Sequence, residues 1–299
     1  MHTGIEGTNE VTRARCAVGE KLAVVLLLAA VAPLPGFAET PIRPDPLLLE
    51  GADPLIEDDG EETIPDGWAG YIGLGVTNGP VFPGSDESEV SAALDVDLTW
   101  RERFFLRSDI GAGAYLLNSE RTGGPVSLGF AIGYDDDERL SDDDPRLAGL
   151  DDVEAGAAAR FLFEYEVGLA DLEVVASRGL GSSGHEGTTV EASLGFDLPV
   201  GERTVISAAP FLIWADSTYM DAFYGISPAV SVTSGYAPYS PGGGLKQAGL
   251  ELSAAYFLTE RVGLFGQIEY GSLLGDAKDS PITFEDTALE VSLGVVLRF

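Results

Sequence analysis

The sequence predicts an all-β protein, a closed antiparallel transmembrane β-barrel of about 12 strands, with 10 strands as the alternative. Three observations lead to this prediction. Apolar side chains alternate with small or charged ones in many segments, as in strands whose two faces meet different surroundings. Several of these segments run for about ten residues or more, the length that crosses a bilayer at a tilt. The chain also ends on an alternating segment closed by the aromatic residue Phe299.

Residues 1–38 are predicted to be a secretory signal peptide. Basic residues precede the apolar run 22–33, and Gly36 and Ala38 supply the small side chains of a cleavage site. The run is shorter than the roughly 20 residues that a transmembrane helix needs. The single cysteine, Cys16, lies before the run, so the processed chain would have neither disulfides nor thiolate metal ligands.

Residues 39–66 are predicted to form an acidic periplasmic linker, because they are rich in Pro, Asp and Glu and show no period. The barrel is then expected to occupy residues 67–299. The whole chain has 17 Lys and Arg against 49 Asp and Glu, a formal net charge of −32. This balance excludes a role that depends on neutralising nucleic-acid phosphates, so no nucleic acid is expected as a partner.

The clearest predicted strand spans residues 90–100. Val90 and Leu94 belong to its apolar face, and Asp95 and Asp97 belong to the opposite face. The same alternation predicts further strands along the chain. They are expected near 68–77, 103–116, 125–135, 153–167, 171–178, 190–198, 203–214, 248–256, 261–273 and 287–299.

One more crossing is expected between two of these strands. With the other connections as predicted, 125–135 and 153–167 would run in the same direction. The acidic segment 135–152 would then have to bring the chain back across the wall. Eleven visible strands and this hidden one give the even number twelve that is usual for bacterial barrels.

In a barrel the apolar face meets lipid and the polar face lines the lumen. The expected lumen charges are Asp95, Asp97, Arg107, Asp109, Glu154, Arg160, Glu164, Glu166, Glu191, Asp197, Glu251, Glu269, Glu290 and Arg298. A water-filled lumen of this composition would favour cations. A closed barrel would instead hold the charges in a hydrogen-bonded ladder, with Arg107 near Asp95 or Asp97, and both forms remain open.

Trp100 and Phe104 flank the tight turn Arg101–Glu102 and are expected in the aromatic girdle at the bilayer interface. An ordinary hairpin with an aromatic pair is the alternative. Loop lengths predict the orientation of the barrel. The short periplasmic turns are expected at Arg101–Glu102, Gly168–Ala170, Pro199–Arg203 and Leu258–Glu260. The longer outside loops are expected near 118–124, 179–187, 215–245 and 274–284.

His185 is the one histidine that remains after removal of the signal peptide. Together with Ser182 and Ser183 it could supply a nucleophile and a base, as in a hydrolase. A polar side chain in a flexible loop is the simpler interpretation. We therefore predict no catalytic residue and no cofactor.

The acidic run in segment 135–152 could bind Ca²⁺ or Mg²⁺ weakly, with Asp142, Asp143 and Asp144 as candidate ligands. It lacks the glycine-turn spacing of a dedicated calcium loop, so a solvated acidic loop is the alternative. The loop 215–245 is crowded with tyrosine and phenylalanine. It could be an exposed recognition surface or could fold inward as a lid.

Four stretches carry a resemblance to a known family. They are 70–88, 142–161, 217–250 and 270–284, and they occur in the family's order before a terminal Phe. The chain resembles the MltA-interacting protein (MipA/OmpV) family of outer-membrane proteins over essentially all of 68–299. The resemblance implies an outer-membrane barrel in contact with lipid and lipopolysaccharide. The terminal strand, ending on Phe299, resembles the signal read by the barrel-assembly machinery.

The resemblance also implies what the barrel does. One branch of the family looks like a scaffold that joins a lytic transglycosylase to a bifunctional penicillin-binding protein, and other members are linked to osmotic response, adhesion or uptake. We therefore expect a non-enzymatic scaffold on the periplasmic side. The alternatives are a narrow, cation-preferring channel or uptake protein and a surface adhesin acting through the loop 215–245.

Overall fold

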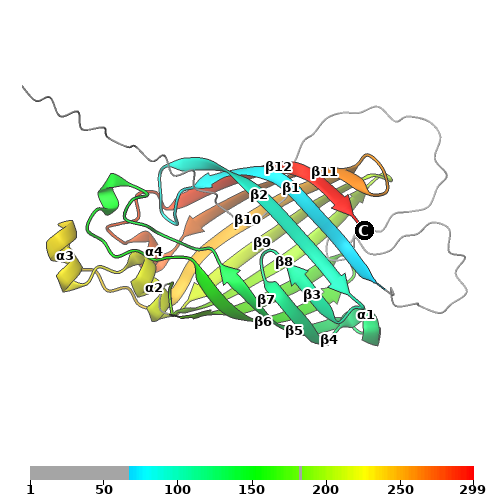
Figure 1. Cartoon of the computed structure of the whole chain (residues 1–299), viewed down its shortest axis with the longest axis horizontal. Helices are drawn as coiled ribbons and strands as arrows, with labels where there is room; N and C mark the ends of the chain where they lie inside the picture. Colours follow the sequence, from blue (N-terminus) through cyan, green and yellow to red (C-terminus); the bar gives the residue numbers. More distant parts are fainter. Residues whose placement is uncertain (1–66, 182–183) are drawn as a thin grey trace, which may run out of the picture.

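The structure, a computed structural model, describes residues 67–181 and 184–299, which fold into a closed barrel of twelve antiparallel strands (Figure 1). The strands are β1 (Trp68–Pro80), β2 (Ser88–Trp100), β3 (Phe104–Arg107), β4 (Gly111–Leu117), β5 (Val126–Asp135), β6 (Gly156–Val167), β7 (Ala170–Leu180), β8 (Thr188–Val200), β9 (Thr204–Ala215), β10 (Gly244–Phe257), β11 (Val262–Leu273) and β12 (Thr287–Arg298). They follow one another in chain order, and β1 pairs with β12 to close the wall. The predicted twelve-stranded antiparallel barrel is confirmed. The predicted signal peptide and linker lie outside the described residues.

The location of the twelfth strand differs from the prediction. The segment 103–116, predicted as one strand, forms both β3 and β4, which are joined by a turn at 108–110. The segment 135–152 makes no crossing, and beyond the end of β5 it is a loop with one turn of 3-10 helix, Pro145–Leu147. The physical reason is local, because Ser, Asp and Gly favour turns and Gly111 adopts φ +104°, which L side chains rarely do.

This split changes the direction of β5 and the place of one loop. The loop near 118–124, predicted to be outside, contains α1 (Ser119–Thr122) and lies at the same end as the tight turns. Its length misled the prediction, because a capped helical turn takes more residues than a hairpin turn. Asn118 caps α1 by accepting from the Arg121 N–H.

The two ends of the barrel are therefore different. We call the end with α1 the short-turn end, and its connections are 101–103, 118–125, 168–169, 201–203 and 258–261. We call the opposite end the long-loop end, and its connections are 81–87, 136–155, 181–187, 216–243 and 274–286. In Figure 1 the carboxyl terminus and α1 lie at one end of the barrel, and α2, α3 and α4 lie at the other.

Helices of the long-loop end are α2 (Ser217–Tyr224), α3 (Pro228–Ser234) and α4 (Gly275–Lys278). Asp216 caps α2 by accepting from the Tyr219 N–H, and Ser227 caps α3 by accepting from the Val230 N–H. None of the helices in the described residues is long and apolar enough to span a membrane.

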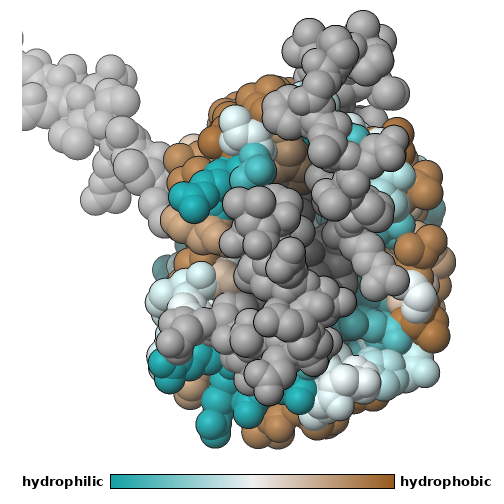
Figure 2. Space-filling view, turned by 90° about the vertical axis from the view of Figure 1, so that its right-hand side faces the viewer, coloured by the Kyte–Doolittle hydropathy of each residue, from teal (hydrophilic) through white to brown (hydrophobic). Residues whose placement is uncertain are grey.

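Alternation gives the wall two faces. Large apolar side chains such as Leu74, Val90 and Ile132 point outward and are exposed, whereas Asp95 and Gln267 point inward and are buried. Figure 2, a view of the short-turn end, shows hydrophobic residues around the circumference of the barrel. A wall that is apolar outside and polar inside is the arrangement of a barrel in lipid.

An aromatic cluster marks the short-turn end. The rings of Trp68 and Trp100 are 6.5 Å apart, and those of Trp100 and Phe104 are 5.7 Å apart. The turn between β2 and β3 places Arg101 and Glu102 at positive φ, the backbone form of the tightest hairpins. The structure thus brings the expected girdle residues Trp100 and Phe104 together at one edge of the wall.

Candidate functional site

Inside the barrel, Arg107 forms the centre of an ion-pair cluster. Its guanidinium lies 2.8 Å from Asp109, 3.2 Å from Glu164 and 2.9 Å from Glu173. Asp97 faces Arg107 in the register of β2 and β3, as expected across that hairpin. Sequence reasoning missed Glu173, although it alternates with Asp171 in the predicted strand 171–178 and could have been found by that pattern.

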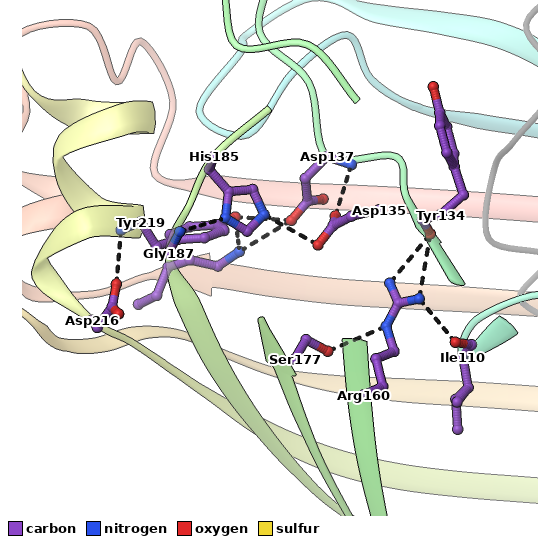
Figure 3. A network of polar contacts seen from close by, with 11 residues as sticks. Ile110, Tyr134, Asp135, Asp137, Arg160, Ser177, His185, Gly187, Asp216 and Tyr219 are labelled. Carbon is purple, nitrogen blue, oxygen red and sulfur yellow. Dashed lines mark hydrogen bonds and ion pairs between the residues drawn. The ribbon is translucent and has the colours of Figure 1, made fainter. Parts of the chain in front are cut away.

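Arg160 ties the turn between β3 and β4 to the neighbouring wall (Figure 3). Its guanidinium donates to the carbonyl of Ile110 at 2.9 Å and to Ser177 Oγ at 3.2 Å. It also donates to the carbonyl of Tyr134 at 3.3 Å. The buried Arg160 therefore donates hydrogen bonds to backbone carbonyls at the turn between β3 and β4, where the strand pairing of the wall stops.

The opposite side of the lumen carries a row of carboxylates. Glu251 of β10 lies opposite Glu269 of β11, which lies opposite Glu290 of β12. Like charges at directly opposed positions destabilise a sheet, so this row favours a cationic neighbour. Sequence alternation indicated these residues, but only the register shows that they are adjacent.

Other expected lumen residues are distributed more widely. Asp95, Asp97, Glu191 and Asp197 line a lumen cavity of about 440 Å³. Glu166 accepts from Ser119 Oγ at 2.9 Å near the short-turn end, and Arg298 is half-buried on β12. The prediction that Glu154 lines the lumen was wrong, because Glu154 is exposed in the loop before β6. The alternation that predicted it continues beyond the true start of that strand.

At the mouth of the lumen His185 belongs to a buried polar network (Figure 3). Its Nε2 lies 3.1 Å from Asp135 Oδ2, and its Nδ1 accepts from the Gly187 N–H at 3.2 Å. With Nδ1 as an acceptor, Nε2 is the ring nitrogen that donates to Asp135. His185 is 5% exposed, which differs from the predicted flexible loop residue. Ser182 and Ser183 lie outside the described residues.

Tyr219 extends this network into α2. Its hydroxyl donates to Asp137 at 2.8 Å and accepts from Lys246 Nζ at 2.8 Å. Burial, together with the nearby Asp137 carboxylate, holds the pKa of Tyr219 well above its usual range. The phenol therefore stays protonated and links the loop 216–243 to β10.

Apolar side chains pack together at the long-loop end. One cluster is formed by Val153, Ala215, Tyr219, Met220, Phe223, Tyr224, Leu273 and Ala277. A second is formed by Phe82, Leu147, Leu150, Ile226 and Ile282. The aromatic loop folds inward in this arrangement, as a lid would. We call these packed loops the cap.

Polar contacts reinforce the cap. Arg139 donates to the carbonyls of Phe223 and Ala222, both at 3.2 Å. Arg146 forms ion pairs with Asp144 and Asp86, and its guanidinium lies 3.7 Å from the Phe284 ring centroid. Three loops therefore meet at one arginine.

The candidate cation ligands have other contacts. Asp144 accepts from the Arg146 N–H at 2.7 Å, and Asp143 accepts from the Leu140 N–H at 2.7 Å. Hydrogen bonds from Arg146 lower the pKa of Asp144. Across 67–181 and 184–299, no group of three His, Cys, Asp or Glu side chains is placed to hold a metal ion.

A barrel with a lipid-facing apolar wall, an acidic lumen and a packed cap defines an outer-membrane type of barrel protein. A family model described as MltA-interacting protein MipA matches residues 72–299. The chain therefore belongs to the MipA family, and it is an outer-membrane barrel protein. The resemblance seen in the sequence is confirmed.

Comparison with solved structures returns other barrels. Neisserial surface protein A is 11% identical, with 78% of this chain and 99% of that chain covered and a TM-score of 0.25. Outer membrane protein H from P. aeruginosa is 12% identical, covering 77% and 100%, with a TM-score of 0.29. Outer membrane phospholipase A from Escherichia coli is 15% identical, covering 80% and 94%, with a TM-score of 0.34. No curated protein matches the chain.

Proposed function

We propose that the protein is a non-enzymatic scaffold in the outer membrane. Its short-turn end would face the periplasm and bind murein-remodelling enzymes, a lytic transglycosylase and a bifunctional penicillin-binding protein. The family's description as MltA-interacting supports a protein partner. The barrel-assembly machinery would insert it by reading the strand that ends on Phe299.

The observation that carries this proposal is the contrast between the two ends. Packed loops occupy the long-loop end, whereas short turns at the other end present arginines in an otherwise acidic protein. These are Arg101, Arg103, Arg121, Arg203 and Arg261. Arg101 lies 4.7 Å from the Trp100 ring centroid, and Arg103 lies 5.8 Å from that of Phe104. The same turns carry Glu102, Glu120, Glu202 and Glu260, so this end presents charges of both signs that can fix the orientation of a docked protein.

The contacts of His185 support a non-enzymatic role. Both ring nitrogens of His185 are hydrogen-bonded, one to Asp135 and the other to the Gly187 N–H, so neither nitrogen is placed to activate a hydroxyl. The barrel then serves as a platform whose binding partners perform the chemistry.

The test is co-purification after mild detergent extraction, with lytic transglycosylase and penicillin-binding protein measured by mass spectrometry. Arg121→Glu with Arg261→Glu should lower their recovery by roughly tenfold, because charge reversal opposes the docking surface. Arg178→Glu with Lys278→Glu is the matched control at the long-loop end and should change nothing. Recovery of these enzymes no better than with an unrelated barrel would refute the scaffold.

A narrow cation-preferring channel is the second candidate. The opposed carboxylates of Glu251, Glu269 and Glu290 favour it, because a row of one sign attracts cations and repels anions. The cap opposes free conduction, which is why the scaffold is the better supported function.

A further inference from the structure

The wall of the barrel is incomplete in its half toward the long-loop end. β2 pairs with β3 only over Asp97–Trp100, and β5 pairs with β4 only over Leu128–Ile132. The short hairpin of β3 and β4 fills the wall at the short-turn end and stops at 108–110. No strand among the described residues continues it. We call the opening bounded by 88–95, by that turn and by 133–135 the notch.

Backbone groups of β2 point into the notch. The Val96 N–H donates to Ser108 Oγ at 2.7 Å, and the Val96 carbonyl accepts from the Ser108 N–H at 2.8 Å. Ser108 Oγ also donates to the Leu94 carbonyl at 3.3 Å. Because groups on one side of a strand recur at every second residue, those of Ala92 and Val90 face the notch as well. Such an edge is unstable against pure hydrocarbon and needs a polar or hydrated neighbour.

A cavity of about 370 Å³ lies beside the notch. Its lining includes Glu89 and Ser91, which point inward from β2, and Tyr134, which belongs to the outward face of β5. Phe82 and Leu273 add apolar surface to the same space. The cavity is therefore lined by residues that belong to both faces of the wall, at the place where the notch interrupts it.

A row of glutamates runs inward from the edge of the notch. Glu89 of β2 lies opposite Gly79 of β1, and the Glu290 side chain lies over Gly79 from the other side. The row continues from Glu290 to Glu269 and from there to Glu251. The absence of a side chain at Gly79 keeps the row open, and its charge is complementary to a cation.

Gln267 supplies an independent sign of a ligand. It is 1% exposed, lines the lumen cavity, and has no hydrogen-bond partner for either Oε1 or Nε2 among the described residues. A buried amide in this state is costly, so the lumen beside Glu269, which is two residues further along β11 and lines both cavities, is incomplete without water or a bound molecule. The carboxylates are spread along a row and do not converge on a metal, and an organic cation fits this spacing better.

We propose that the notch is a lateral binding site for a single-chain amphiphile with a cationic headgroup. The apolar chain lies between Tyr134 and the outward edge of β2, and the headgroup lies at the glutamate row. The cap packs across the axial route at the long-loop end, so the notch in the wall is the proposed way in from the membrane. The orientation proposed above places the notch in the outer leaflet, and the site is otherwise independent of the scaffold role.

The test uses the purified full chain in phosphatidylcholine nanodiscs and a dodecyltrimethylammonium probe that carries a diazirine in its chain. Saturable photolabelling should concentrate on peptides that contain 88–95 and 133–138. Unlabelled dodecyltrimethylammonium should compete roughly tenfold better than tetramethylammonium or dodecyl sulfate, because only it has both a chain and a positive charge. Labelling spread evenly over the lipid-facing strands, or equal competition by either control compound, would overturn the proposal.

Two sets of variants localise the site. Glu89→Gln with Glu290→Gln should weaken labelling roughly tenfold by removing charge from the row. Ala92→Trp, which fills the edge of the notch, should do the same. Val76→Trp is its matched control, because Val76 is the register partner of Ala92 and has the same outward face one strand away. If the glutamate variant fails to fold, the comparison of Ala92→Trp with Val76→Trp tests the proposal instead. Equal labelling of these two variants would contradict binding at the notch.

Discussion

Arg146 shows how much a single side chain contributes to the cap. It joins the loop 136–155 to Asp86 in the loop 81–87 and to Phe284 in the loop 274–286. Hydrogen bonds from Arg146 also lower the pKa of Asp86, as they do for Asp144. Loops that are far apart in sequence are thus held by one guanidinium with an aromatic ring beneath it.

A pH dependence follows from these lowered pKa values. A carboxyl group whose pKa is depressed by folding stabilises the folded form above its ordinary pKa of about 3.9, and this contribution is lost as pH falls through the depressed value. We expect the amide protection factors of 81–87 and 274–286, which are corrected for the intrinsic pH dependence of exchange, to be high at pH 7 and pH 5 and to fall below about pH 3.5.

Arg146→Gln tests this expectation. The variant should have protection factors roughly threefold lower at pH 7, as for a partly exposed ion pair, and should lose most of the fall in protection between pH 5 and pH 3. Arg178→Gln, at an exposed ion pair with Asp216 elsewhere at the same end, serves as the control. Wild-type exchange in Arg146→Gln would show that the aromatic contacts hold the cap alone.

The contacts of the loop residue His185 could not be predicted from the sequence. Its partners Asp135 and Gly187 are in part distant along the chain, and its burial depends on the ring of Tyr219, 4.7 Å away between centroids. The alternation of apolar and polar residues predicts strands and gives no information about the structure of loops. The lumen charges on strands could be predicted because the period itself fixes which face a side chain occupies.

Among the elements, the hairpin of β3 and β4 departs most from expectation. β3 has four residues, too few for a period to separate it from the strand that follows. The longer strands were predictable because many alternating positions agree. The turn-forming residues at 108–110 and Gly111 indicate the hairpin in the sequence. The prediction gave more weight to the alternation on either side of them and therefore missed it.

Gly111→Ala should disrupt this hairpin. A Cβ at Gly111 would lie 2.4 Å from the Gly133 Cα and 2.5 Å from the Ile132 carbonyl oxygen, so β4 and β5 could not keep their spacing. We expect a clear loss of the folded form, measured by the difference in gel mobility between unheated and heated samples.

Gly201→Ala separates this clash from backbone strain. Gly201 also has positive φ, +70°, but a Cβ there would meet nothing within 4 Å. Its cost should stay at about 1–2 kcal/mol, the penalty of the left-handed region alone. Equal losses in the two variants would mean that strain, and not the approach of β5, makes glycine necessary at 111.

For the molecule as a whole, the cap and the acidic row predict conduction behaviour. The wild-type barrel in a planar bilayer should carry little current, because packed loops cover the lumen. Phe82→Asp should open the cap, since it places a charge at a side chain that is 2% exposed in the second apolar cluster. The current that results should be cation-selective in a salt gradient.

Neutralising the row tests the source of that selectivity. Adding Glu251→Gln, Glu269→Gln and Glu290→Gln to Phe82→Asp should move the reversal potential toward zero, whereas adding Glu202→Gln at the short-turn end should not. Anion selectivity of the opened barrel would contradict the assignment of these carboxylates to the conducting path.

Sequence alone predicted the architecture at this scale because a closed barrel repeats one simple rule in every strand. The family resemblance added order and identity. A lid formed by 215–245 was one of two alternatives that the sequence left open. Its packing against the other loops could not be predicted, because Phe82, Leu147 and Ile226 come from three different loops and have no shared period. Nor could the notch, which depends on where two strands stop.

The pairing of β1 with β12 has a consequence for biogenesis. Because the last strand supplies the partner of the first, the sheet keeps two open edges until residue 299 has been synthesised and exported. Contacts of such high sequence separation form slowly, and unpaired edges invite aggregation in the meantime. The polypeptide therefore needs chaperoning in transit across the cell envelope, and a truncation that removes only the final dozen residues would harm it more than a large deletion within a loop.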